Sequence, residues 1–231
     1  MSMLFKQRMM IKEEIAKITA ELPLGVKLIA VSKFHPAEAV MEAYEAGQRL
    51  FGENKVQEMT AKHEVLPQDI QWHFIGHLQT NKVKYIALFV TMIHSIDSLH
   101  LLTEVNRQAE KAGRTIDCLL QLHIAHEETK FGFTFDECRD MLEEGSWKQL
   151  NHVRICGLMG MATFTDDMNQ VEREFASLKA FFDELKGSYF KDSPAFKELS
   201  MGMTDDYPIA IRQGSTFIRI GTKIFGVRNY N

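Results

Sequence analysis

The chain has 231 residues, of which 45% are hydrophobic and 25% are charged, proportions that are ordinary for a soluble globular protein. Its 27 Lys and Arg residues against 31 Asp and Glu residues give a formal net charge of −4, so we expect no nucleic-acid partner, because such binding requires a basic face. The charged first 18 residues exclude a signal peptide, and the longest apolar stretch, residues 85–93, is far shorter than the roughly 20 residues that span a bilayer.

Helical and strand signals alternate along the chain. Ile11, Ile15, Ile18 and Leu22 recur at helical spacing, which predicts a helix at the start. Short apolar runs then predict strands over residues 27–31, 49–51, 71–75, 90–94, 115–124, 153–158, 197–200 and 216–220. Capping residues and helical periodicity predict helices between them, over residues 36–47, 53–62, 81–87, 98–113, 134–145, 171–185 and 207–214.

This alternation of strands and helices predicts parallel strands with right-handed crossovers. Eight such repeats in 231 residues without a linker fit an α/β fold with a single (β/α)₈ TIM-type barrel over residues 1–231 and an extra N-terminal helix. An open, doubly wound sheet is the rival architecture. The strands around residues 49, 90 and 197 rest on the shortest signals.

Lys33 is the first candidate for chemistry, because it directly follows the first predicted strand. In a barrel of this type the functional mouth lies at the carboxyl ends of the strands. Only a neutral amine attacks a carbonyl group, and both burial and a neighbouring cation favour the neutral form of lysine. Taken alone, however, the position fits a surface lysine at a strand end better.

Two glycine-bearing loops strengthen the case for Lys33. Ser200-x-Gly202 follows the seventh predicted strand, and Gly221-Thr222 follows the eighth. In barrels of this type these loops commonly form a phosphate site, with glycine backbone N–H groups and Ser or Thr hydroxyls as donors. Each loop alone is ordinary turn chemistry, but the two loops flanking Lys33 favour a phosphate ester that carries an aldehyde.

Arg219 is a charged residue inside the apolar run of residues 216–221. A buried guanidinium needs an acceptor. The simplest expectation is a carboxylate such as Glu53 or Asp205, or a position that faces solvent. The sharper hypothesis is that Arg219 faces the ring nitrogen of pyridoxal phosphate (PLP).

Several longer motifs carry a family resemblance from about residue 26 to Tyr230. These motifs occupy residues 30–33, 47–58, 72–82, 157–161, 199–206 and 218–226. In them the chain resembles the pyridoxal phosphate homeostasis proteins, which are similar to the N-terminal barrel of alanine racemase. The resemblance implies a protein that holds PLP as a Schiff base on a lysine and takes part in intracellular vitamin B6 homeostasis.

The same resemblance assigns roles to individual residues. It implies that Lys33 carries the Schiff base and that Arg219 faces the pyridine nitrogen. It places the phosphate among Ser200, Gly202, Gly221 and Thr222, with Asn54 and Met201 as further pocket residues. Free amino acids and apo-enzymes that receive the cofactor are the partners it suggests. The sequence departs from the family pattern at His77, and around Lys130 and Gly132, where residues 123–130 are otherwise a loose match.

Two enzymatic alternatives were weighed against the carrier. A PLP-dependent racemase or decarboxylase is disfavoured, because Arg219 cannot give a proton to the ring nitrogen at neutral pH. A racemase also needs a second domain, which we do not expect in a chain that ends five residues after Gly226. A phosphosugar isomerase would need a carboxylate base, for which Glu53 is the obvious candidate, and would leave Lys33 unexplained.

No metal site is expected. The pairs His73/His77 and His123/His126 have metal-like spacing, but the first lacks the glutamate of a zinc motif and lies on a strand-to-loop segment. Asp205-Asp206 is better explained as a helix cap than as a magnesium ligand.

The cysteine content indicates the compartment. Cys118, Cys138 and Cys156 form no CxxC motif and cannot all pair. We therefore expect reduced, mostly buried thiols in a cytoplasmic, monomeric protein.

Overall fold

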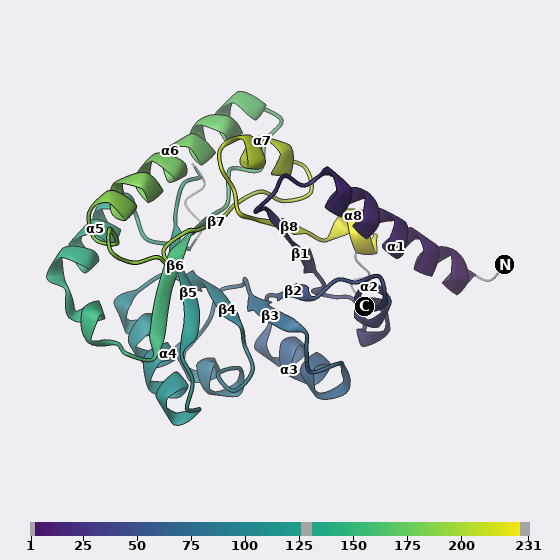
Figure 1. Ribbon diagram of the computed structural model, residues 1–231, viewed down its shortest axis with the longest axis horizontal. Coiled ribbons are helices and arrows are strands. Elements are labelled where there is room, and N and C mark those ends of the chain that lie inside the picture. The colour runs from purple at the N-terminus through teal and green to yellow at the C-terminus, as the bar shows by residue number, and fades with distance from the viewer. Residues whose placement is uncertain (1–2, 126–130, 227–231) are drawn as a thin grey trace.

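Eight parallel strands form a closed barrel in which β8 pairs with β1 (Figure 1). The computed structural model describes residues 3–125 and 131–226. The strands are β1 Lys27–Val31, β2 Leu50–Glu53, β3 Gln71–Phe74, β4 Met92–Ile96, β5 Ile116–Leu122, β6 Val153–Gly160, β7 Glu198–Ser200 and β8 Phe217–Ile220. Their closed, sequential order confirms the predicted barrel and rules out the open sheet.

Helices surround the barrel (Figure 1). They are α1 Met3–Glu21, α2 Ala37–Glu45, α3 Val56–Val65, α4 Leu99–Lys111, α5 Phe135–Glu144, α6 Met168–Gly187, α7 Tyr207–Arg212 and α8 Thr222–Phe225, with 3₁₀ helices η1 Thr80–Tyr85 and η2 Ser146–Gln149. The extra helix α1 packs beside α2 and α8 through the predicted Ile11, Ile15 and Ile18, all buried. No helix within residues 3–125 and 131–226 is both long and apolar enough to cross a membrane.

Several element boundaries differ from the sequence-based expectation. A 3₁₀ helix replaces the α-helix predicted over residues 81–87, and η2 and α8 were not predicted because each is a single turn. The helix predicted from Glu53 begins at Val56 instead. Glu53 belongs to β2, because its carbonyl accepts the backbone N–H of Ile75 at 2.9 Å and so extends the ladder to β3.

The apolar interior has two parts. The larger part lies between the barrel and its helices and includes Trp72, Phe74 and Phe175. The smaller part is a separate cluster inside the barrel, drawn from five different strands: Ile29, Met92, Leu119, Cys156, Met159 and Phe217. Because side chains of alternate residues in a strand point to opposite faces, the same strands fill both parts.

All three cysteines are free and buried.

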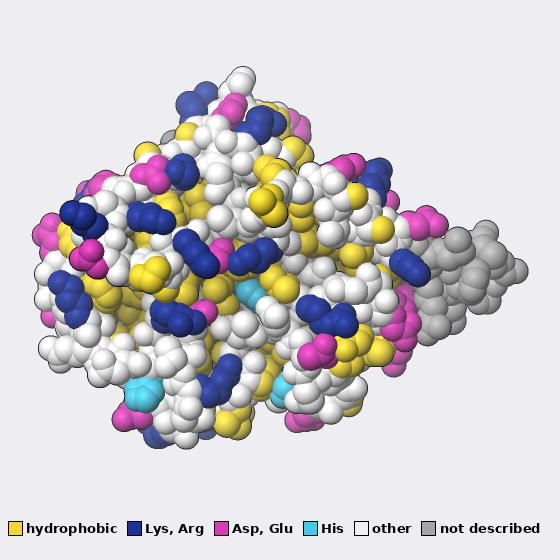
Figure 2. All heavy atoms as spheres, viewed as in Figure 1, with side chains coloured by type: hydrophobic (Ala, Val, Ile, Leu, Met, Phe, Trp, Pro, Cys, Tyr) yellow, Lys and Arg dark blue, Asp and Glu magenta, His cyan; other side chains and the backbone are white. Residues whose placement is uncertain are grey.

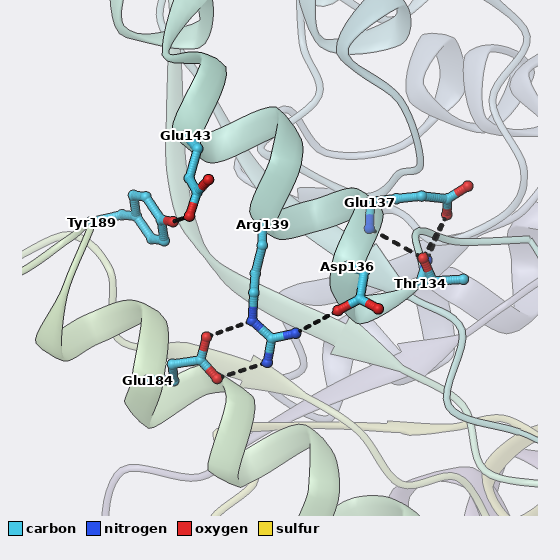
Figure 3. A network of polar contacts seen from close by, with 7 residues as sticks. All are labelled: Thr134, Asp136, Glu137, Arg139, Glu143, Glu184 and Tyr189. Atoms are coloured by element: carbon cyan, nitrogen blue, oxygen red, sulfur yellow. Dashed lines mark hydrogen bonds and ion pairs between the residues drawn. The ribbon is translucent and has the colours of Figure 1, made fainter.

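The outer helices α5 and α6 are joined by polar contacts (Figure 3). Thr134 and Glu137 form a capping box that starts α5. Arg139 donates two parallel hydrogen bonds to Glu184 of α6, at 2.7 and 2.8 Å, and a third to Asp136 at 2.8 Å. These bonds raise the pKa of Arg139, so the pairing persists at every physiological pH.

Candidate functional site

A pocket of about 250 Å³ opens at the carboxyl ends of the strands. Five predicted site residues line it: Lys33, Asn54, Arg219, Gly221 and Thr222. Its volume is just below the roughly 300–1,000 Å³ of pockets for drug-sized ligands. The pocket therefore suits a small ring compound rather than a dinucleotide.

The backbone on both sides of Lys33 is anchored to β2 and α3. Before Lys33, the Ser32 hydroxyl donates to Glu53 at 2.6 Å. After it, the Phe34 N–H donates to Glu58 at 2.6 Å. Phe34 has a left-handed φ of 65°, which is rare for a bulky residue and persists only where its surroundings hold it. The Glu58 contact therefore fixes the bend that turns the chain just after Lys33.

Lys62 of α3 completes this anchor. Its ammonium donates to Glu53 at 2.6 Å, to Glu58 at 2.8 Å and to the carbonyl of Ser32 at 2.8 Å. All three of its protons therefore have acceptors. Burial raises the pKa of the Glu53 carboxyl to about 7, although the Lys62 ammonium opposes the rise. Because Glu53 is fully buried and does not line the pocket, it is not placed to act as the base of a phosphosugar isomerase.

Arg219 lines the pocket from β8, and among the described residues no carboxylate accepts a hydrogen bond from it, unlike the simplest expectation. Its guanidinium donates to the Ser200 hydroxyl at 2.6 Å and to the carbonyl of Gly160 at 3.0 Å. Glu53 is instead bound to Lys62. Burial lowers the pKa of Arg219 to about 10, with Asp206 opposing the shift. The residue thus keeps its charge at neutral pH and acts only as a donor.

Ser200 and Met201, which the sequence predicts to contact the cofactor, are not among the residues that line the pocket. Both are fully buried, and the Ser200 hydroxyl contacts Arg219 and His94 inside the barrel. The chain reaches the pocket only at Met203 and Thr204. Gly202 makes that turn possible: its φ is +93°, and a Cβ there would lie 2.6 Å from the Cβ of Ala210.

The rim of the pocket carries two residues that sequence reasoning did not assign to the site. His77 stacks on Phe131 with ring centroids 3.9 Å apart, and its Nδ1 lies 3.1 Å from Asp97. On the inner wall, the Asn54 Oδ1 is buried and has no hydrogen-bond partner in the described part of the chain. The loop of Asn54 packs directly on Gly76, where a Cβ would lie 2.4 Å from the Asn54 carbonyl.

Of the two histidine pairs with metal-like spacing, His73 and His77 do not come together. His73 is buried inside the barrel, whereas His77 lies at the pocket rim. His126 and Lys130 lie outside the described residues. Over residues 3–125 and 131–226 no trio of His, Cys, Asp or Glu could hold a metal ion. Asp206 is the N-cap residue of α7, but its carboxylate accepts the N–H of Met203 before the helix.

Known proteins share this architecture and much of this sequence. The family model for the N-terminal domain of alanine racemase matches residues 8–229. A protein of Aquifex aeolicus named pyridoxal phosphate homeostasis protein is 39% identical over 205 residues, which cover 88% of each chain. One of the same name from Schizosaccharomyces pombe is 37% identical over 207 residues, 88% of this chain and 85% of its own. The chain belongs to the pyridoxal phosphate homeostasis protein family.

A solved structure from this family carries the cofactor. PipY of Synechococcus elongatus, determined with PLP bound, superposes with a TM-score of 0.83 at 40% identity, covering 94% of this chain and 100% of its own. The pocket described above has the donors that a phosphate ester with an aldehyde would use. They are the Lys33 amine, the Thr204 and Thr222 hydroxyls, the Arg219 guanidinium and the loop at Gly221.

Three features that shape the site are not assigned to it by the sequence analysis. Thr204 lies in the same loop as Ser200 and Gly202, and its lining of the pocket is seen only in the structure. The pairing of Glu53 with Lys62 could have been suspected, because each charged residue occurs among the apolar positions of its own element. Nothing in the local sequence signals the stacking of His77 on Phe131, which depends on how two distant loops meet.

Proposed function

We propose that this protein binds PLP in the pocket as a Schiff base on Lys33 and serves vitamin B6 homeostasis as a carrier of the cofactor. The observation that carries the proposal is the anchored Lys33, which lines a small pocket together with Arg219 and two threonines. Homologues named for PLP homeostasis, and a relative solved with PLP, support it.

Four of the lining residues have a role toward the cofactor in this proposal. When bound, PLP supplies an aldehyde that captures amines and a pyridine ring that withdraws electrons. The Lys33 amine condenses with the aldehyde, forming a C=N bond and releasing water. The Thr204 and Thr222 hydroxyls donate to the phosphate, and Arg219 donates to the ring nitrogen.

Arg219 is also the reason to favour a carrier over a racemase or decarboxylase. With a pKa of about 10 it keeps its protons at pH 7, so it leaves the ring nitrogen without a proton and the ring is a weak electron sink. Among the described residues that line the pocket there is no Asp or Glu to remove a substrate proton.

The partners and setting follow from the same chemistry. A lysine-bound aldehyde exchanges with other amines, so we propose free amino acids and apo-enzymes as recipients of the cofactor. Three free, buried thiols fit the reducing cytoplasm. We further propose that the protein acts there as a monomer.

Replacement of Lys33 tests the binding proposal. Lys33→Ala should lose the visible absorbance of lysine-bound PLP and its borohydride-trapped adduct, while circular dichroism stays unchanged. Lys55→Ala is the matched control. Lys55 is exposed, and its ammonium lies over the ring of Phe34, the residue that follows Lys33, but Lys55 does not line the pocket. A trapped adduct that persists on another lysine in Lys33→Ala would overturn the assignment.

Deuterium wash-in separates carrier from enzyme. PLP-loaded protein in D₂O should leave the α-proton of alanine in place over times at which an enzyme, working at about 1–10³ s⁻¹, would have exchanged it. The α-proton NMR signal of alanine measures this directly. Exchange within that range of rates would establish an enzyme instead.

A further inference from the structure

A second cavity, of about 560 Å³, lies at the opposite end of the barrel from the cofactor pocket. The residues that begin the strands line it, among them Lys27, Gln71, Glu198 and Phe217. Figure 2 shows a face of the molecule on which basic and acidic side chains gather around a central histidine. The proposed cofactor chemistry lies at the other mouth of the barrel, so this cavity has no role in the proposed function.

A chain of buried side chains links the two ends of the barrel. Arg219, at the cofactor pocket, lies 2.6 Å from the Ser200 hydroxyl. That hydroxyl lies 3.0 Å from Nδ1 of His94, and Nε2 of His94 lies 2.8 Å from Nδ1 of His73. All four residues are at most 3% exposed, and His73 lines the second cavity.

The donors and acceptors that each side chain has fix the direction of the hydrogen bonds from Arg219 to His73. Arginine has only donors, so the Ser200 oxygen accepts. The Ser200 proton then goes to Nδ1 of His94, which makes Nε2 of His94 the donor to Nδ1 of His73. The reverse order would leave the Ser200 proton without an acceptor among the described residues, which is costly in the interior. Burial lowers the pKa of His73 to about 3, so this ring is neutral and carries its single proton on Nε2.

His73 therefore presents an unused donor to the second cavity. Its Nε2 is buried and has no hydrogen-bond partner in the part of the chain that the structure describes. The Lys27 ammonium also lowers the pKa of His73. An unpaired N–H donor is complementary to an anion.

The charges that line the cavity reinforce this preference. Two of its cations are paired with its two carboxylates: Lys27 with Glu198 at 2.8 Å, and Arg154 with Asp117 at 2.7 Å. Lys197, exposed at the same rim, forms no ion pair with any described residue. One positive charge thus remains unmatched at the rim of the cavity that His73 lines.

We propose that this cavity is a second ligand site, which binds the carboxylate or phosphate group of a small anion through His73 Nε2–H and the Lys197 ammonium. The site is independent of the PLP proposal, because it uses no residue of the cofactor pocket. Through Ser200 and His94 it contacts Arg219, so a bound anion would act on the same hydrogen-bond chain that holds that arginine.

The test is a residue-resolved NMR titration of the full chain, with and without saturating PLP. Inorganic phosphate and, separately, acetate are added at constant ionic strength. We expect saturable shifts at the His73 ring nitrogens and at the Thr91 and Phe217 amides in both samples. Long-range ¹⁵N spectra should show the His73 proton on Nε2. The anion that binds more tightly identifies the preferred group, and tight binding of either one supports the site.

Lys197→Ala should weaken anion binding about three- to fivefold, the usual range for one exposed charge. Its control is Lys17→Ala, which removes the same charge from an exposed position on α1, and should change nothing. Shifts confined to the Gly221 and Thr222 amides would place the anion in the cofactor pocket and overturn the proposal. So would an affinity that is insensitive to Lys197→Ala, a response that does not saturate, or a His73 proton found on Nδ1.

Discussion

Two hydroxyl residues that lie four positions apart, at the end of β7 and after it, have different surroundings. Ser200 ends the strand inside the barrel, where its oxygen accepts from Arg219. Thr204 follows the turn at Gly202 and lines the cofactor pocket. Ser200 should therefore act on the position of Arg219, and Thr204 on the phosphate.

Substitution of these hydroxyls should separate the two roles. Thr204→Val combined with Thr222→Val should weaken PLP binding tenfold or more, because each hydrogen bond to a charged group contributes about 1.5–3 kcal/mol. Ser200→Ala should instead lower the unfolding free energy by about 1–3 kcal/mol, since Arg219 and His94 lose a buried partner. Absorbance titration and urea unfolding measure the two effects.

The opposite pattern would assign the phosphate to Ser200, as the sequence predicts. If Ser200→Ala weakened PLP binding as strongly as the double threonine variant while the stability stayed unchanged, Ser200 would be the phosphate donor after all. Thr165→Val, a substitution on the neighbouring loop outside the cofactor pocket, controls for the loss of a threonine hydroxyl.

The residues of the cofactor pocket could be predicted to the extent that each lies close to the end of a strand. Lys33, Asn54, Gly221 and Thr222 each lie within two residues of a strand end, and all four line the same pocket. Ser200 could not be placed in this way. Whether the last residue of a strand faces the lumen or the mouth depends on the register of its neighbours, which one sequence does not determine.

Among the elements, α3 has the most direct influence on the site. Its Lys62 joins β1 and β2 by binding the Ser32 carbonyl and the Glu53 carboxylate. The helix thereby holds the backbone that carries Lys33. Lys62 is a buried cation that donates hydrogen bonds to three acceptors. Removal of Lys62 leaves the Glu53 carboxylate without a cation in the interior.

Lys62→Met should lower the unfolding free energy at pH 7 by about 3–5 kcal/mol. The loss should be smaller at pH 5.5, because protonation of the stranded Glu53 is then less unfavourable. Urea unfolding at the two pH values measures this, with Lys55→Met as the exposed control. An equal loss at both pH values would mean that Glu53 is not the group left unpaired.

The order of the elements could be predicted because each strand and helix signals itself locally. Apolar runs gave all eight strands, and capping residues gave the starts of α4 and α5. The errors lie where tertiary contacts decide. Glu53 looks like a helix start but pairs with β3, and η1 tightens to a 3₁₀ helix where it packs against α4.

At the scale of the whole molecule, three buried titratable groups make stability depend on pH. Burial lowers the pKa of His73 to about 3 and that of His94 well below its usual value. Below pH 6.5 the unfolded chain therefore binds two protons that the folded chain excludes, and stability falls with falling pH. Glu53, with its pKa raised to about 7, acts in the opposite sense. It stabilises the fold fully below its unfolded pKa, and this contribution is lost as the pH rises through 7.

The balance of these groups gives a measurable slope. At pH 5.5 the unfolded chain holds about 0.9 proton more on His73, and the folded chain about 0.9 proton more on Glu53, so these two effects nearly cancel. The lowered pKa of His94 acts in the same direction as that of His73, so stability should rise with pH, by at most about 1.2 kcal/mol per pH unit. Glu53→Gln removes the opposing contribution and should make the slope steeper. Urea unfolding between pH 5 and 6.5 tests both expectations. In the wild type, stability that falls as the pH rises would show that the two histidines are protonated in the folded state, because Glu53 alone would then set the slope.

The closure of the barrel has a consequence for how the protein comes into being during translation. Ile29 of β1 pairs with Arg219 of β8, so nearly the whole chain separates the two partners of this seam. A ribosome must therefore release β8 before the ring of strands can close. Since Lys33 follows β1 and Arg219 lies on β8, the cofactor pocket is assembled across the same seam. A nascent chain can thus acquire a complete pocket only after β8 has been synthesised and released.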